Sequence, residues 1–287
     1  MRMFRKINMK TPRAERVADI THYLTENPRT LISLSFFANR YSSAKSSISE
    51  DITILKKTFK EHGFGLLKTI PGAAGGVKFY PYMLERDTNN FVDKIIKEVN
   101  NETRVLPGGY VYLSDLLGRP KILHQIGRIV STQYLNKNIQ AIMTAATKGI
   151  PIAYAIAEQL NVPFVFVRPG ETKVTEGPSV SVNYLTGVPN HIEKMSLPKR
   201  GLPNGDGILI VDDFMKAGGT INGMLALAKE FNAKVKGIFI FAEGRTKKRN
   251  INNFTSLLHI DTNLDSGEII KVQPGNYKQN IYRIKEK

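Results

Sequence analysis

Apolar residues recur at the spacing of an α-helix three times before residue 63. The three apolar stripes are Val17, Ile20 and Leu24; Leu34, Phe37, Ala38 and Tyr41; and Ala44, Ile48, Ile52, Leu55 and Phe59. They predict three helices, because positions three and four apart share one helix face. Thr11 and Ser33 are expected to cap the first two helices, and Gly63 to end the third. Two strand-like runs, residues 66–70 and 77–80, flank a glycine-rich turn and predict a hairpin.

The third predicted helix has a polar, mostly basic stripe opposite its apolar one. This stripe consists of Lys45, Ser49, Thr53, Lys56 and Lys60. The second helix is short, and the third begins directly after the turn at residues 42–43. Three helices followed by a basic hairpin resemble a winged helix-turn-helix, in which the third helix reads DNA. The alternative is a three-helix regulatory or dimerisation domain whose basic face is only solvated.

Basic and hydroxyl side chains of this region are the candidate contacts with double-stranded DNA, since both donate hydrogen bonds to phosphates. They are Arg13, Arg16, Ser43, Lys45, Ser46, Ser49, Lys56, Lys60, Lys68 and Lys78. Residues 1–84 hold 14 Lys and Arg against 6 Asp and Glu, a net of +8, and the remaining 203 residues hold 27 against 19, also +8. Less than a third of the chain thus carries half of the excess, which favours a distinct basic first domain.

The whole chain has 287 residues and a formal charge of +16, which fits two domains and a polyanionic partner. Hydrophobic residues make up 41%, which excludes disorder as the main state, and no apolar run is long enough to span a membrane. The absence of cysteine excludes disulfides, thiolate zinc sites and thiol catalysis. The five histidines are scattered, so no metal site is predicted. The basic first residues lack the apolar core of a signal peptide, and the cytoplasm is the expected location.

Strand-like and helix-like runs alternate in the second part of the chain. Strands are predicted at residues 139–144, 162–168, 207–212 and 235–241, helices at 150–160 and 220–231, and closing strands at 256–262 and 268–273. Continuous apolar strands in such alternation predict an α/β fold with a mainly parallel sheet covered on both faces. We therefore expect two domains, residues 1–84 and 85–287. Ligands of such sheets bind at the carboxyl ends of the strands.

Two loops at predicted strand ends contain groups that can bind a ligand. The first loop offers two carboxylates that can accept hydrogen bonds from a diol, followed by small residues whose backbone N–H groups can hold an anion at a helix start. It consists of Asp212, Asp213, Lys216, Ala217, Gly218, Gly219 and Thr220. The second loop follows the strand near Thr144 and contains Thr147, Lys148 and Gly149. Two anion loops with a diol acceptor between them predict a phosphorylated sugar as the ligand.

The stretch of residues 208–220 resembles the phosphoribosyl-pyrophosphate (PRPP) signature of type I phosphoribosyltransferases: four apolar residues, two acids and a small-residue phosphate loop. The resemblance implies that Asp212 and Asp213 hold the ribose hydroxyls and that residues 216–220 hold the 5′-phosphate. It also implies that residues 147–149 hold the pyrophosphate, and that Mg²⁺ can accompany the ligand. It extends over most of the chain from about residue 100 onward.

Together with the winged helix-turn-helix, the whole chain resembles the purine operon repressor family of Gram-positive bacteria, through residues 43–54, 71–78, 106–112 and 212–223. The resemblance implies a homodimeric DNA-binding repressor of purine genes, released from its operators by PRPP as inducer. It implies no required cofactor, and it places Tyr110 or Tyr112 near the PRPP.

The main alternative to this regulator is an active purine phosphoribosyltransferase with a basic accessory domain. In hypoxanthine-guanine enzymes of this fold an acid that manages the ring proton of the purine stands where Lys216 stands here, and a lysine does not easily take that role. A further alternative is a nucleic-acid-binding structural protein whose sugar-phosphate pocket is vestigial. The sequence favours a sensor over an enzyme.

Overall fold

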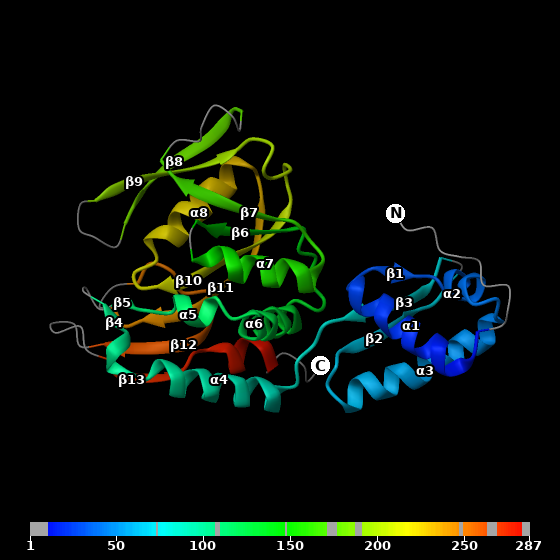
Figure 1. The fold of residues 1–287 in the computed structure, drawn as a ribbon. Helices are drawn as coiled ribbons and strands as arrows, with labels where there is room; N and C mark the ends of the chain where they lie inside the picture. Colours follow the sequence, from blue (N-terminus) through cyan, green and yellow to red (C-terminus); the bar gives the residue numbers. More distant parts are fainter. Residues whose placement is uncertain are drawn as a thin grey trace. The chain divides into compact units, whose positions relative to one another are not determined.

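The chain forms two compact units in the computed structural model (Figure 1). The structure describes residues 11–72, 74–106, 110–146, 148–170, 177–186, 191–246, 249–262 and 269–282. The first unit comprises Met1–Leu84 with Gln159–Asn161, and the second comprises Glu85–Glu158 with Val162–Lys287. Apart from residues 159–161, this division falls after residue 84, which is the boundary expected between the two domains.

The first unit contains three helices and a small antiparallel sheet. Its elements are α1 (Arg13–Glu26), β1 (Leu31–Ile32), α2 (Leu34–Arg40), α3 (Lys45–Glu61), β2 (Leu66–Ile70) and β3 (Gly76–Tyr80). The predicted stripes meet in one core, where Ile20, Phe37 and Ile48 are fully buried. The strand order is β1-β3-β2. The two-residue strand β1 is too short for an alternating pattern and was not predicted, but the winged helix-turn-helix arrangement is confirmed.

Two of the three predicted helix boundaries agree with the structure. The Ser33 hydroxyl accepts a hydrogen bond from the Phe36 amide at 3.1 Å, as an N-cap does. Gly63 lies just after the end of α3 with a left-handed φ of 67°, which favours glycine. The predicted cap at Thr11 is wrong: α1 begins after Pro12, whose extended backbone precedes the first turn and offers no side-chain cap.

The cap of α2 supports a first stability prediction. Ser33→Ala should lower the free energy of unfolding of the first unit by about 1 kcal/mol, because the Phe36 amide loses its acceptor. Hydrogen exchange of the α2 amides in increasing urea measures this change. Ser35→Ala, inside the same helix, is the matched control and should be neutral or slightly stabilising. An equal loss in both variants would contradict the capping role.

The second unit is built around an eight-stranded sheet. Its helices are α4 (Glu85–Val99), α5 (Ser114–Leu117), α6 (Pro120–Gln133), α7 (Gly149–Leu160) and α8 (Gly219–Glu230), with the helical turns η1 (Glu102–Arg104) and η3 (Lys278–Tyr282). Its strands are β4 (Val105–Leu106), β5 (Tyr110–Val111), β6 (Ala141–Ala145), β7 (Phe164–Pro169), β8 (Ser179–Leu185), β9 (Ile192–Pro198), β10 (Gly207–Met215), β11 (Lys234–Gly244), β12 (Thr255–Thr262) and β13 (Ile269–Pro274).

The strand order of the large sheet is β13-β12-β11-β10-β6-β7-β9-β8, and the five strands from β12 to β7 are parallel. This confirms the predicted mainly parallel sheet. The antiparallel strands β8 and β9 were not predicted. Residues 179–185 interleave Ser and Asn with Val and Tyr, so they lack the continuous apolar run by which the buried strands are recognised.

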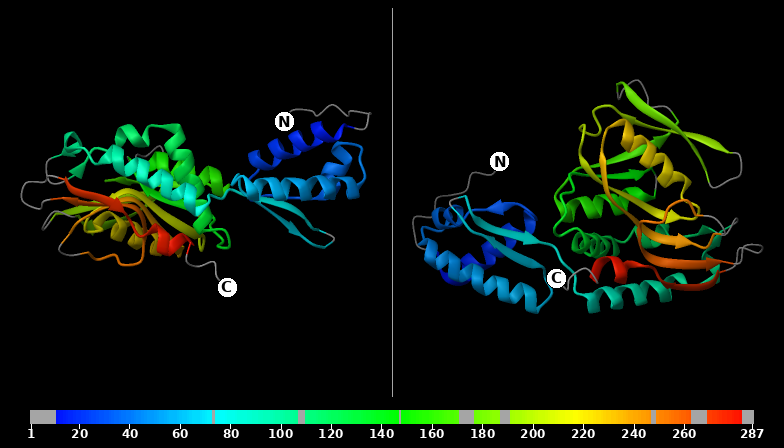
Figure 2. Two further views of the ribbon diagram at one scale, coloured as in Figure 1. Left: turned by 90° about the horizontal axis from the view of Figure 1, so that it is seen from below. Right: turned by 180° about the vertical axis from the view of Figure 1, so that it is seen from behind.

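The topology of the sheet determines where a ligand can bind. The chain passes from β6 through α7 to β7 in one direction along the sheet, and from β10 through α8 to β11 in the other. Right-handed crossovers therefore place α7 and α8 on opposite faces (Figure 2). The strand order reverses between β6 and β10, and a crevice opens at the carboxyl ends of strands at such a switch point.

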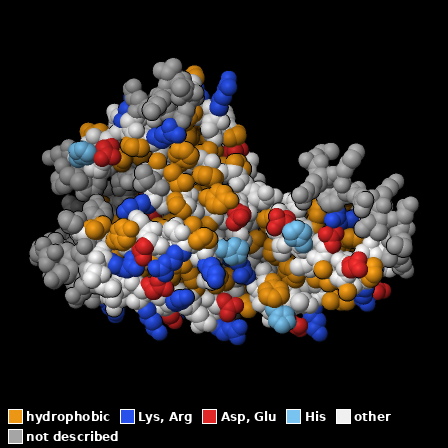
Figure 3. Space-filling model, in the orientation of Figure 1, with side chains coloured by type: hydrophobic (Ala, Val, Ile, Leu, Met, Phe, Trp, Pro, Cys, Tyr) orange, Lys and Arg blue, Asp and Glu red, His pale blue; other side chains and the backbone are white. Residues whose placement is uncertain are grey.

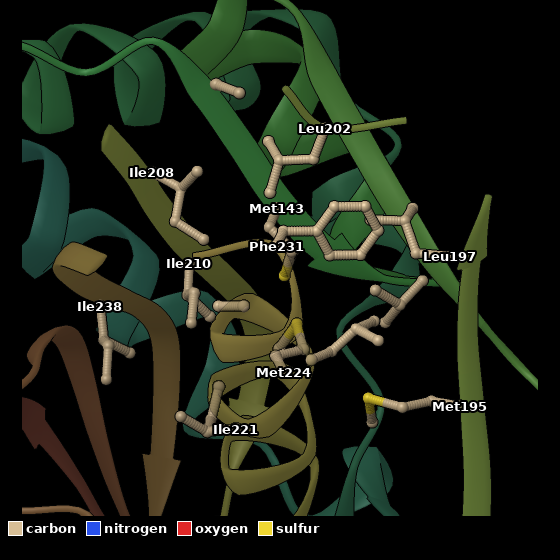
Figure 4. Close-up of a cluster of buried hydrophobic side chains, with 14 of the residues drawn as sticks. Met143, Met195, Leu197, Leu202, Ile208, Ile210, Ile221, Met224, Phe231 and Ile238 are labelled. Atoms are coloured by element: carbon tan, nitrogen blue, oxygen red, sulfur yellow. The ribbon is translucent and has the colours of Figure 1, made fainter. Parts of the chain in front are cut away.

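The core on the α8 face holds this arrangement together. Figure 4 shows Ile221 and Met224 of α8 among Ile208 and Ile210 of β10 and Met143 of β6. All five side chains are almost fully buried. Their packing keeps the first turn of α8 in position after the end of β10. No helix in the described parts of the chain is both long and apolar enough to cross a bilayer.

Candidate functional site

An acid pair lies at the carboxyl end of β10, beside the end of β6. Val211 is paired in register with Thr144, so Asp212 and Asp213, which still belong to β10, lie level with the end of β6. Asp212 is buried and Asp213 is half-buried. The Asp213 amide donates to Asp212 Oδ1 at 3.0 Å. The two predicted acids thus occupy the switch point.

Burial dominates the ionisation of this pair. It raises the pKa of Asp212 well above its usual value, and the neighbouring Asp213 raises it further. Burial also raises the pKa of Asp213, while the Lys148 ammonium opposes that rise. Two carboxylates held close together with little solvent favour a ligand that donates hydrogen bonds or brings a cation. Among the described residues, no cluster of three or more metal-ligating side chains is present.

The loop between β10 and α8 forms a small pocket. Gly218 caps α8 with a left-handed φ of 94°. A Cβ atom on Gly219 would lie 2.5 Å from the carbonyl oxygen of Leu185, so only glycine fits there. The pocket has a volume of about 110 Å³ and is lined by Asp212 and residues 214–221. All five predicted phosphate-loop residues, 216–220, are therefore in it, where backbone amides at a helix start can bind an anion.

The second predicted loop lies next to the acid pair. A Cβ atom on Gly149 would lie 2.2 Å from Thr144 Oγ1 and 3.5 Å from Asp212 Oδ1, so the start of α7 closely approaches the carboxylates. Lys148 is exposed, and its charge acts on Asp213. Thr147 lies outside the described residues. The structure thus brings Lys148 and Gly149 together with the pair, as predicted.

A partly buried ion pair supports the loop between β10 and α8, and the sequence did not predict it. Arg249 pairs with Glu243 and also donates to the Gly244 carbonyl at 2.8 Å and the Lys216 carbonyl at 3.4 Å. The Asn250 amide donates to the Ala217 carbonyl at 3.3 Å. These bonds hold the backbone of the loop from behind. In the sequence, Arg249 stands in a basic, polar run that is typical of an ordinary solvated loop.

Tyr112, one of the two predicted tyrosines, does not line this pocket. Tyr112 is 44% exposed and is absent from the lining, while the side chain of Tyr110 lies outside the described residues. A tyrosine that was not predicted, Tyr184, interacts electrostatically with Asp212. Tyr184 on β8 donates to Glu193 at 2.7 Å, and burial raises its pKa, with further contributions from the charges of Glu193 and Asp212.

The basic stripe of α3 is exposed as predicted. Its members Lys45, Ser49, Thr53, Lys56 and Lys60 all lie at the surface, as does the neighbouring Ser46. Ser43 is half-buried, and its hydroxyl donates to the Tyr41 carbonyl at 3.1 Å. The stripe therefore presents three ammonium groups and two hydroxyls to solvent on one helix.

The hairpin adds a second group of cations. Lys68 of β2 and Lys78 of β3 are directly opposite in register. Their Nζ atoms lie 5.1 and 5.6 Å from the centre of the Tyr80 ring, and the Arg29 guanidinium lies 5.5 Å from it. Burial lowers the pKa of Lys78, and the nearby Arg29 lowers it further. Like charges gathered in this way favour a polyanion. Arg29 was not predicted, because it follows a helix stop and belongs to no basic run.

Arg16, a predicted DNA contact, has a structural role instead, and the neighbouring Arg13 shares its acidic partner. Arg16 is 6% exposed and pairs at 2.8 Å with Asp51, which is completely buried. It also donates to the Thr11 carbonyl at 3.0 Å. Arg13 is half-exposed and donates to the same Asp51 at 3.0 Å. Arg16 joins α1 to α3 within the core and does not face solvent, so we leave it out of the DNA-contact surface.

The second unit carries the other half of the excess positive charge of the chain. Lys and Arg side chains gather over the region of α4, α5 and α6 (Figure 3). On these helices and at the start of α6, the exposed cations are Arg86, Lys94, Lys97, Arg119 and Lys121. Arg119 is partly offset by pairing with Glu98.

Two family models match the chain. Residues 12–81 match "Bacterial purine repressor, N-terminal", and residues 113–273 match "Phosphoribosyl transferase domain". The purine biosynthesis transcriptional repressor PurR of Bacillus subtilis is 49% identical over 270 residues, which cover 94% of each chain. The purine biosynthesis transcriptional activator PurR of Lactococcus lactis is 45% identical over 265 residues, covering 92% of this chain and 97% of its own. A xanthine phosphoribosyltransferase of Clostridium novyi is 27% identical and covers 58% of this chain.

Proposed function

Because the chain belongs to the family of purine biosynthesis transcriptional regulators, we propose that it binds operator DNA of purine genes and that PRPP lowers its DNA affinity. The relatives that match nearly the whole chain, including the DNA-binding unit, are named regulators. The named transferase matches little more than half of it. The chain is therefore a regulator rather than an enzyme, and its phosphoribosyltransferase fold serves as a ligand sensor.

The observation that carries the PRPP proposal is the acid pair between two anion loops at the switch point. Asp212 and Asp213 would accept hydrogen bonds from the ribose hydroxyls, residues 216–220 would hold the 5′-phosphate and residues 147–149 the pyrophosphate. Mg²⁺ commonly binds through one or two carboxylates together with phosphate oxygens of a ligand, and this donor set fits it. When bound, Mg²⁺ would neutralise part of the charge of the ligand; no other cofactor is required.

The exposed stripe of α3 and the cations around Tyr80 support the DNA-binding part of the proposal. A recognition helix enters the major groove, and a basic wing contacts the adjacent backbone. We expect a homodimer, because operator-binding proteins of this architecture commonly use two-fold symmetry. PRPP and DNA would then bind the same dimer antagonistically, each weakening the other by one coupling factor.

Repression is the direction of regulation that we propose, with purine genes silent at low PRPP and released at high PRPP. The relative from Lactococcus lactis is named an activator, so the same architecture is used in both directions. The direction is read from a reporter gene behind the purine promoter: deletion of the regulator should raise its expression. A fall in expression would show that the chain is an activator, and it would not contradict the proposed PRPP site.

The direct test is a titration of purine-gene promoter fragments with the full chain, with and without PRPP. PRPP should weaken DNA binding by about 5- to 150-fold, the range expected for a coupled pair of sites. Ribose 5-phosphate, which lacks the pyrophosphate, is the control and should have a smaller effect. A DNA affinity that is the same with and without saturating PRPP would contradict the proposal, as would rapid pyrophosphate release from PRPP in the presence of a purine base.

A further inference from the structure

A second pocket lies at the amino ends of the strands, on the sheet edge opposite to the acid pair. Its volume is about 350 Å³, at the lower end of the range for small-molecule sites. It is lined by Gln133, Tyr134, Lys137, Leu225, residues 235–238, Asn253, Phe254, Thr255 and Asn280. The pairing of β11 with β12 begins only at Phe239, so the pocket lies where β11 lacks a neighbour on that side among the described residues.

One end of this pocket is built from side-chain amides. Thr255 Oγ1 accepts hydrogen bonds from Gln133 Nε2 at 2.7 Å and from Asn280 Nδ2 at 3.2 Å. The other polar atom of the Gln133 amide, Oε1, is buried and has no hydrogen-bond partner. A buried acceptor without a donor is costly, so this end of the pocket is complementary to a ligand that supplies an N–H group.

The other end is cationic. Lys137 and Lys236 are both exposed, and Lys137 Nζ lies 3.4 Å from the Lys236 carbonyl and 5.3 Å from the centre of the Tyr134 ring. Tyr134 packs so tightly against β11 that a Cβ atom on Gly237 would lie 2.0 Å from its hydroxyl oxygen. None of the described lining residues is acidic. This end therefore favours an anion.

We propose that the pocket binds a nucleoside monophosphate whose base carries an exocyclic amino group. The phosphate would lie between Lys137 and Lys236, and the amino group would donate to Gln133 Oε1, since amide side chains recognise such base edges. This ligand would bind independently of the acid pair, which lies on β10 towards the opposite edge of the same sheet. The chain then has two ligand sites, and the second one responds to the concentration of a nucleotide rather than to that of a sugar phosphate.

The test is calorimetric titration of the full-length chain with adenosine monophosphate. The nucleotide should bind wild type and Asp212→Asn/Asp213→Asn equally, because the proposed site excludes the acid pair. Lys137→Ala/Lys236→Ala should weaken binding by about tenfold or more. Lys229→Ala/Lys271→Ala, which removes two exposed lysines elsewhere on the same unit, is the matched control and should bind as wild type does.

Adenosine and inorganic phosphate are the two partial probes. Each meets only one end of the pocket, so each should bind at least about tenfold more weakly than the monophosphate. Bound nucleotide should also protect the amides of residues 234–238 from hydrogen exchange. The absence of binding up to about 1 mM nucleotide would overturn the proposal. So would inorganic phosphate that binds as tightly as the nucleotide, or nucleotide binding that requires the acid pair and not the lysines.

Discussion

Replacing Lys45, Lys56 and Lys60 together by alanine should weaken DNA binding roughly a hundredfold or more at physiological salt. All three ammonium groups lie on the exposed stripe of α3, and each phosphate contact that is lost returns condensed counterions to the DNA. The slope of log affinity against log salt concentration should therefore become shallower by about three. Fluorescence anisotropy of a labelled promoter fragment, measured between about 50 and 200 mM salt, gives both quantities.

Lys57→Ala is the matched control for this variant. Lys57 belongs to the same helix and is 76% exposed on its side chain, but it lies next to Glu61, with 3.9 Å between their charged atoms. Its replacement should leave the affinity within about twofold, as is usual for surface substitutions of little energetic effect. If Lys57→Ala matched the triple variant, or if the triple variant kept the wild-type salt slope, the stripe of α3 would not be the DNA-contact surface.

Replacing Asp212 and Asp213 by asparagine should abolish the response of DNA binding to PRPP. Each carboxylate can accept a hydrogen bond from a ribose hydroxyl, and hydrogen bonds to charged groups are worth about 1.5–3 kcal/mol. The double variant should therefore bind PRPP at least about a hundredfold more weakly. Its DNA affinity without PRPP should match that of wild type, because the acids lie outside the winged helix-turn-helix unit. Unchanged release of DNA by PRPP would contradict the role of the pair.

The same substitutions should stabilise the free protein at neutral pH. Burial raises the folded-state pKa of both acids above their unfolded-state values, so the folded chain binds more protons than the unfolded chain between those values. Stability therefore falls as pH rises from the unfolded pKa through the folded pKa, and at pH 7 the pair is destabilising. Each 1 kcal/mol recovered by asparagine should raise Tm by about 2–4 °C. Calorimetry should show this gain in Tm at pH 7. The gain should be lost at about pH 3.5, because this pH lies below the pKa of about 3.9 that an aspartate has in an unfolded chain. A lower Tm of the double variant at pH 7 would show instead that the acid pair stabilises the fold.

The agreement between sequence and structure is strongest where a signal is local. The stripes of α1, α2 and α3 follow from a spacing of three and four residues, and they pack in or against the core. The exception is Ala44, which is exposed and precedes α3 as its N-cap residue. The loop between β10 and α8 is recognisable because a buried strand, two acids and a glycine-rich helix start are contiguous. Backbone geometry enforces such patterns: Gly218 has a left-handed φ, and a side chain on Gly219 would strike the backbone of β8.

Tertiary structure alone decided which charged residues are available for binding. Arg16 and Lys56 look alike in the sequence as members of a basic unit, but Arg16 lies in the core because Asp51, thirty-five positions away, needs a partner there. Arg249 supports the loop between β10 and α8 across 33 positions, and the pocket beside Gln133 is assembled from segments between residues 133 and 280. Helical periodicity and glycine geometry are set within a few neighbouring residues and are therefore recognisable in the sequence. Desolvation of a charge depends on which distant segments the fold packs against it, and only the folded chain determines that.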